Sequence, residues 1–79
     1  IDMRKVLIYF DYTNGFDDKK TFECIKNKIG VNEEEVERVY ELMNNDYELI
    51  TLIDDDYPLR FKRDYNFPPI VIKVRKESN

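Results

Sequence analysis

Histidine and tryptophan are absent from this 79-residue chain, and cysteine occurs once, at Cys24. The lack of histidine removes the commonest general base at neutral pH and the commonest zinc ligand. A single cysteine excludes an intramolecular disulfide framework and is typical of a reducing cytoplasm, where we expect the protein to act. Because no histidine is there to activate Cys24 as a nucleophile, we expect a buried or half-buried thiol.

Long apolar runs are missing too. The longest, "VLIYF" and "IVI", are far too short to cross a bilayer, so we expect no membrane partner. The composition, 42% hydrophobic and 14% aromatic, is nevertheless that of a folded chain despite 38% charge. A chain of this size buries only about 60% of its unfolded surface, so we expect one small domain, 1–79, that gains from a partner.

The net charge of −4 conceals three different segments. Residues 1–28 carry +1, residues 29–57 carry −9 and residues 58–79 carry +4. A uniform nucleic-acid binder does not have this distribution. If nucleic acid is bound, the C-terminal third is the place.

Residues 4–12 fit two structures. Their β-branched and aromatic content favours a strand, the Asn14-Gly15 pair is a hairpin turn signal, and four residues alternate as in a strand: Val6, Ile8, Phe10 and Tyr12. The spacing of Met3, Leu7 and Phe10 fits one face of a helix just as well. The residues alone leave both structures open.

Two helices are predicted more clearly. Asp17 or Asp18 caps the first, which has an apolar stripe and a stop at Gly30. The second begins at Asn32, with Glu35 as its capping-box partner, and ends at Asn44-Asn45. The stripe residues are Phe22, Ile25 and Ile29 in the first, and Val36, Val39, Tyr40 and Met43 in the second.

Two strands follow. Residues 47–53, "YELITLI", are apolar on both faces, as in a strand covered on both sides. In residues 68–76, "PPIVIKVRK", the alternation places Ile70, Ile72 and Val74 on one face and Val71, Lys73 and Arg75 on the other. Between the strands, Asp56-Tyr57-Pro58 is typical of a helix cap and first turn.

The predicted fold is therefore a small α+β domain. Two or three short N-terminal helices (1–46) are followed by a two-stranded β element with a short connecting helix (47–76). The strands pair with each other or with a second copy, because a two-stranded ribbon alone is marginal.

An ordered set of residues in this second part resembles the start of the Rossmann-like domain of the DprA/Smf DNA-processing family. The set is Ile50, Thr51, Asp54, Tyr57, Pro58, Leu59, Tyr65, Pro68 and Pro69. The preceding "RKVLIYFDY" and the amphipathic helices are similar to the helical N-terminal module of some members. The resemblance implies a helix for residues 4–12 and a strand-to-helix corner at 54–58 with Tyr57 packed inward.

The family binds single-stranded DNA and helps to load the RecA recombinase during transformation. The resemblance implies those activities only for a full-length relative. Members continue into a glycine-rich Rossmann turn that carries the main DNA pocket, whereas this chain reads "KVRKESN" there and has two glycines. That pocket is therefore not transferred.

The aspartate run Asp54-Asp55-Asp56 has two interpretations. Carboxylate oxygens suit Mg²⁺ or Ca²⁺, but the spacing of a calcium loop is missing and three consecutive carboxylates at a strand end cannot all face one ion. We therefore expect a turn and cap.

A basic set and an acidic set are the candidate contact surfaces. The basic set offers phosphate contacts, with Tyr57, Phe61, Tyr65 or Phe67 as stacking platforms, and its alternative is an edge strand kept soluble by Lys and Arg. The acidic set is either a solvated helix face or a surface that docks a basic partner or mimics DNA phosphates. The sets are Arg60, Lys62, Arg63, Lys73, Arg75 and Lys76, and Glu33, Glu34, Glu37 and Glu41.

The N-terminal aromatic residues are predicted to be core, with self-association in a homodimer as the alternative. They are Tyr9, Phe10, Tyr12 and Phe16. No nucleophile–base pair or metal set is recognisable, so we expect no catalytic residues, metal or cofactor.

The predicted function is a non-enzymatic protein-interaction module related to DNA processing and recombination. Its partner would be a recombination or other DNA-handling protein, with weak single-stranded DNA contact through the C-terminal third. The alternative is a small acidic inhibitor from a phage or mobile element that blocks a nucleic-acid-binding protein by DNA mimicry.

Overall fold

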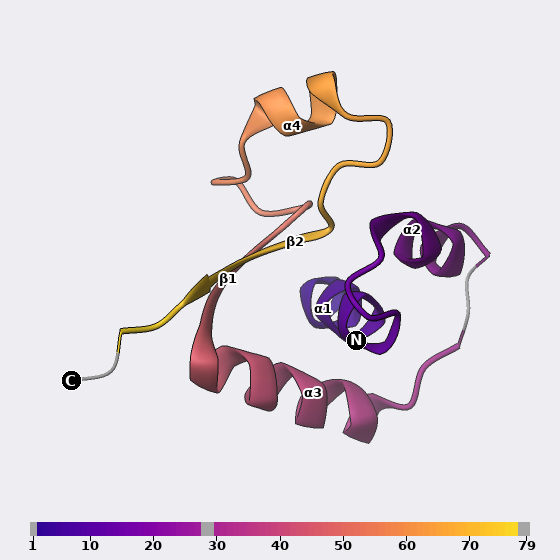
Figure 1. Ribbon diagram of the computed structural model, residues 1–79. Coiled ribbons are helices and arrows are strands. Elements are labelled where there is room, and N and C mark those ends of the chain that lie inside the picture. Colours follow the sequence, from indigo (N-terminus) through magenta and orange to yellow (C-terminus); the bar gives the residue numbers. More distant parts are fainter. Residues whose placement is uncertain (1, 28–29, 78–79) are drawn as a thin grey trace.

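The computed structural model describes residues 2–27 and 30–77. Helices and strands follow one another in the predicted order (Figure 1). The elements are α1 (Met3–Thr13), α2 (Asp18–Lys26), α3 (Glu33–Asp46), β1 (Tyr47–Thr51), α4 (Leu59–Asp64) and β2 (Val71–Arg75). The α+β class, with its N-terminal helices and a two-stranded element around a short helix, is confirmed.

Helix α1 settles the open alternative for residues 4–12 in favour of a helix. The Asp2 carboxylate caps it by accepting from the backbone N–H of Arg4, at 2.9 Å, and of Lys5, at 3.4 Å. Its buried residues are Val6, Leu7, Ile8, Phe10 and Asp11. Because α1 is buried on much of its circumference, its apolar residues satisfy the strand period as well as the helix period.

Helices α2 and α3 begin at the predicted caps. Asp17 accepts from the N–H of Lys20 at 3.1 Å, and Asn32 accepts from the N–H of Glu34 at 2.9 Å. Helix α2 ends at Lys26, before the predicted stop at Gly30, and the predicted stripe residue Ile29 lies outside the described residues.

Helix α3 packs through the predicted stripe. Val36, Val39 and Met43 are buried, and Tyr40 packs against the core. The helix runs to Asp46, one residue beyond the predicted end. The Glu35 carboxylate pairs with Arg38, three residues along the helix, and among the described residues it accepts no bond from the N–H of Asn32. The predicted capping box is therefore wrong.

Strands β1 and β2 form one antiparallel sheet, in which Ile50 lies opposite Ile72. Leu49 and Thr51 on β1 and Val71 on β2 face the helices and are buried. The other face is open: Glu48 and Val74 are exposed, Val74 by 53%, and the helices α1 and α3 lie on one side of the strands (Figure 1). The prediction that β1 is covered on both sides is therefore wrong.

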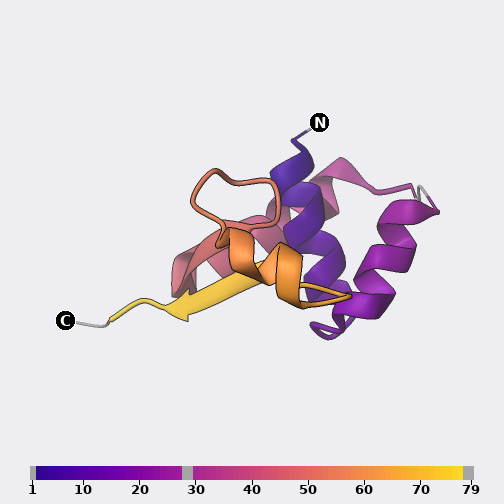
Figure 2. The same cartoon turned by 90° about the horizontal axis from the view of Figure 1, so that it is seen from above.

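Helix α4 stands apart from this core, and none of its residues is buried. Pro58 is its N-cap residue and no side chain caps it, so the predicted cap by Asp56 is wrong. Figure 1 places α4 above the sheet and α3 below it, and in the view from above α4 lies in front (Figure 2). Within residues 2–27 and 30–77, no helix has the length and apolar character needed to cross a membrane.

Candidate nucleic-acid interface

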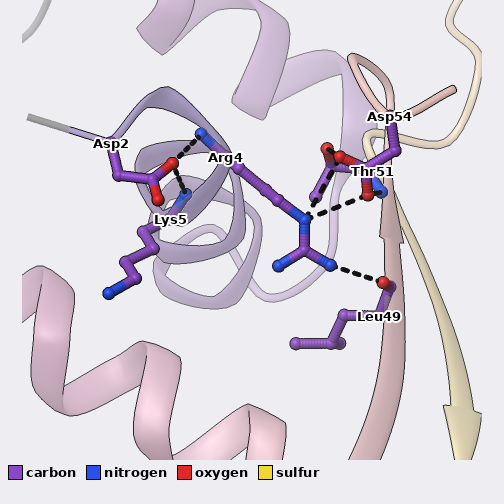
Figure 3. A network of polar contacts seen from close by, with 6 residues as sticks. All are labelled: Asp2, Arg4, Lys5, Leu49, Thr51 and Asp54. Carbon is purple, nitrogen blue, oxygen red and sulfur yellow. Dashed lines mark hydrogen bonds and ion pairs between the residues drawn. The ribbon is translucent and has the colours of Figure 1, made fainter.

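The aspartate run turns the chain after β1, as predicted. The Asp54 carboxylate accepts from the backbone N–H of Thr51, at 2.8 Å, and from the Thr51 hydroxyl, at 2.9 Å. Both of its oxygens also lie 3.1 Å from Nε of Arg4 on α1 (Figure 3). Burial opposes ionisation, but the bonds from Thr51 and Arg4 outweigh it and hold the pKa of Asp54 below its ordinary value.

This geometry uses Asp54 as a structural anchor. Its neighbours Asp55 and Asp56 are exposed. In the described ranges, no three His, Cys, Asp or Glu side chains gather where they would hold a metal ion. The sequence indicated the turn but missed Arg4, which is 50 residues away and carries no local signal of its partner.

Tyr57 lies at the start of the segment that carries α4 between β1 and β2. Its ring is only 3% exposed, and its hydroxyl donates to the carbonyl of Pro69 at 2.7 Å, which confirms that it packs inward. Where the two strands adjoin this segment, the N–H of Leu52 donates to the carbonyl of Ile70 at 2.9 Å. We call the segment held in this way, residues 58–68, the α4 arm.

Three of the six candidate cations lie on the α4 arm. Arg60, Lys62 and Arg63 are all exposed. The guanidinium of Arg60 lies 5.4 Å from the ring centroid of Phe61, and the Phe61 and Tyr65 rings meet edge to face at 5.7 Å. Tyr65 is 55% exposed. Arg63 pairs with Asp64 at 2.9 Å, so the arm presents a net positive charge beside an accessible aromatic ring.

The other three candidate cations lie elsewhere, so the six do not form one patch. Lys73 turns toward the helices, with its ammonium 3.4 Å from the Asp11 carboxylate and 4.1 Å from the centroid of the Phe16 ring. Arg75 lies over the Tyr47 ring at 5.3 Å, and the Lys76 ammonium donates to the carbonyl of Asn44 at 2.6 Å. These two sit at the end of β2 that is farther from the arm.

The acidic candidates occupy α3, on the opposite side of the sheet from the arm (Figure 1). Glu33, Glu34, Glu37 and Glu41 are all exposed. Glu37 is paired with the Lys5 ammonium at 2.9 Å. Glu33 and Glu34 lie in the first turn, where the helix dipole favours negative charge, so part of this set has a structural role as well.

The N-terminal aromatic residues divide into two pairs. Phe10 is buried and Tyr9 packs partly against the core, as predicted. Tyr12 and Phe16 are 39% and 43% exposed and pack edge to face on each other, so the core prediction is wrong for them. Tyr12 lies in the last turn of α1, and Phe16 lies in the turn that follows the helix.

Cys24 is half-buried, which confirms the prediction. Its sulfur lies 3.4 Å from Nδ2 of Asn14, and its side chain packs against the cluster of Val6, Phe10 and Val36. It is part of the packing between α1 and α2.

Sequence reasoning missed one buried carboxyl group, that of Asp11. It is 1% exposed, Oδ2 lies 3.4 Å from the Lys73 ammonium, and Oδ1 has no hydrogen-bond partner among the described residues. Burial raises the pKa of Asp11 to about 6, Lys73 opposes that shift, and the nearby Asp18 adds to it. The available signal was an aspartate that directly follows the apolar run "VLIYF".

Comparison of the chain with protein-family models, with curated proteins and with solved structures finds no match. The resemblance to the DprA/Smf family therefore stays a prediction.

Proposed function

We propose that this protein is a non-enzymatic binding module that contacts single-stranded nucleic acid through the α4 arm. One observation carries the proposal: Arg60, Lys62 and Arg63 are exposed on the same projecting segment as the accessible Tyr65 ring. Cationic side chains contact phosphates and a free ring stacks on a base, which together bind single strands with little sequence preference. The setting that the resemblance implies is DNA processing, with a protein as the main partner.

Charge separation makes this binding compatible with a net charge of −4. The acidic helix α3 lies across the sheet from the arm (Figure 1). Solvent-exposed charges are largely screened beyond about 10 Å at 0.1 M salt. The arm itself carries Arg60, Lys62 and Arg63 against Asp64, which pairs with Arg63 at 2.9 Å, so its net charge is +2. A site with so few cations gives weak, salt-sensitive affinity.

The experiment is fluorescence anisotropy of a labelled oligo-dT of about 15 nucleotides, titrated with the protein at several salt concentrations. Three phosphate contacts predict a slope of about −2 in log K against log salt. Replacing two of the cations, in Arg60→Gln/Lys62→Gln, lowers the slope to about −0.7. Tyr65→Ala, which removes the stacking ring, weakens binding about tenfold.

The matched control is Lys20→Gln/Lys26→Gln, which removes the same charge from exposed positions on α2. Its slope and affinity stay close to those of the wild type if the arm is the site. A slope that falls equally in both double variants would mean that only overall charge matters. Absence of salt-dependent binding by the wild type would refute the proposal.

The second candidate function uses the acidic face of α3. Glu33, Glu34 and Glu41 are exposed, and within the described part of the chain no ion pair engages them, so they offer carboxylates to a basic partner. An inhibitor of this kind binds a basic DNA-handling protein and is displaced by DNA. Glu33→Gln/Glu34→Gln/Glu41→Gln removes that binding and leaves oligo-dT binding intact.

A further inference from the structure

The two outer edges of the sheet differ. The bonds from Leu52 to Ile70 and from Lys76 to Asp46, both 2.9 Å, show that even-numbered residues bond across the ladder. In an antiparallel pair, the backbone groups of the alternate residues then point away from the partner strand. The odd-numbered residues of each strand therefore form its outer edge.

The outer edge of β1 is closed by side chains. The carbonyl of Leu49 accepts from Nη2 of Arg4 at 2.7 Å, and the N–H of Thr51 donates to Asp54 at 2.8 Å (Figure 3). These bonds satisfy backbone groups that would otherwise be available to another strand.

The outer edge of β2 is open. Among the described residues, no hydrogen bond reaches the backbone N–H or C=O of Lys73 or Arg75 away from the ladder, and the carbonyl of Val71 has only a 3.5 Å contact from the Lys73 ammonium. In Figure 2 the C-terminal half of β2 runs along the margin of the molecule. A two-stranded sheet with such an edge gains from a third strand.

Apolar groups lie on both sides of this edge, beside the ion pair of Lys73 with Asp11 on the helix side. One side is the open face of the sheet, with the half-buried Ile72 and the exposed Val74. On the helix side, the Lys73 ammonium lies 4.1 Å from the centroid of the Phe16 ring. Phe16 packs on Tyr12, and both side chains are exposed. Successive side chains of an added strand would alternate between these two surfaces.

We propose that β2 is completed by an extended segment of a partner protein, alternating in apolar residues and acidic at one end. The acidic end follows from charge complementarity with Arg75, which is exposed at the C-terminal end of β2 and forms no ion pair among the described residues. A second copy fits less well, because antiparallel self-pairing centred on β2 sets Lys73 opposite Lys73, and like charges directly opposite are destabilising. This site lies on β2 and is independent of the α4 arm.

The probe is a synthetic peptide of about eight residues with alternating Val and Thr and a Glu-Asp end. Its binding to the whole chain is measured by calorimetry and by amide exchange. We expect protection of the Lys73 and Arg75 amides. The control peptide carries N-methyl groups on alternate residues; it loses at least two hydrogen bonds, and we expect at least about tenfold weaker binding.

Protein variants separate the backbone contact from the charge. Arg75→Pro removes an outward N–H without removing a bond of the ladder, whereas Arg75→Gln removes only the charge. We expect loss of peptide binding in the first variant and a few-fold, salt-dependent weakening in the second. If Arg75→Pro does not fold, the N-methylated peptide with the wild-type protein decides the question.

Three results would overturn the proposal. They are failure of the wild type to bind the probe at millimolar concentration, equal binding of the N-methylated peptide, and a wild-type dimer that Arg75→Pro converts to a monomer. Arg60→Gln/Lys62→Gln should leave peptide binding unchanged, and Arg75→Pro should leave oligo-dT binding unchanged. The β2 site and the arm can therefore fail separately.

Discussion

An ion pair joins α1 to the sheet region near each of its ends, and the two carboxylates differ in burial and in the number of their hydrogen-bond donors. Near its start, Arg4 meets Asp54 at 3.1 Å, and near its end Asp11 meets Lys73 at 3.4 Å. Asp54 also receives two hydrogen bonds from Thr51, whereas Oδ1 of Asp11 has no partner among the described residues. The pKa of Asp54 lies below its ordinary value, and that of Asp11 is raised to about 6.

A nearby cation does not by itself make the ionised form of a buried carboxyl group favourable. Burial raises the pKa of both groups, and more so for Asp11, whose side chain is 2% exposed against 17% for Asp54. The donors that stabilise the charged form then decide the direction of the shift. Asp54 has the N–H and hydroxyl of Thr51 besides Arg4, and Asp11 has one long contact. The first pair should therefore stabilise the fold and the second should cost stability at neutral pH.

The largest effect is expected from Asp54→Ala. The variant leaves the Thr51 N–H and hydroxyl and the Arg4 guanidinium without their acceptor, and we expect a loss of about 3 kcal/mol in the free energy of unfolding. Urea denaturation monitored by circular dichroism measures it. The control is the exposed neighbour, in Asp55→Ala, for which we expect a change within about 0.5 kcal/mol. Equal effects of the two variants would contradict an anchoring role for Asp54.

A smaller effect of opposite sign is expected from Asp11→Asn. Because the pKa of Asp11 rises from 3.8 to about 6 on folding, the folded state binds more protons between these values, and this residue's contribution to stability falls as pH rises through that window. The variant should be more stable than wild type by about 1–2 kcal/mol at pH 7. The gain is smaller than the full pKa shift corresponds to, because the variant still buries a polar amide and takes the carboxylate partner from Lys73. Urea denaturation at pH 5 and pH 7 measures it.

The sign distinguishes the two aspartates. The contribution of Asp54, whose pKa is lowered on folding, is present above its unfolded pKa and is lost as pH falls through the folded value. In Asp11→Asn, the loss of stability in acid that comes from Asp54 should therefore remain. The fall in stability as pH rises from about 4 to 6, which comes from Asp11, should be absent. If the difference in free energy of unfolding between Asp11→Asn and wild type were the same at pH 5 and pH 7, Asp11 would be ionised with an ordinary pKa.

Much of the fold could be predicted because the signals are local. The caps at Asp17 and Asn32, the apolar stripe of α3 and the change to a strand period each involve residues close together in sequence. The corner at Tyr57 was also predicted, from the resemblance. Helix α1 was ambiguous because burial on several sides removes the periodicity that distinguishes a helix from a strand.

The candidate site could be predicted only in part, because its residues are brought together by tertiary contacts. Alternation correctly set Lys73 and Val71 on one face of β2, but could not tell that this face meets the helices. There Lys73 meets the carboxylate of Asp11, 62 residues earlier, and the ring of Phe16. The six cations therefore looked like one patch in sequence and are divided in space.

The smallest effect is expected at a third tie of α1, the exposed pair of Lys5 with Glu37 on α3. The ammonium and carboxylate lie 2.9 Å apart, shorter than the contact of Asp11 with Lys73, yet the Glu37 side chain is 53% exposed. Water solvates both ions when the pair is broken, so a short distance adds little here. Glu37→Gln should leave the urea midpoint within experimental error of the wild type. A loss approaching that of Asp54→Ala would mean that distance, rather than burial and the number of donors, sets the strength of these ties.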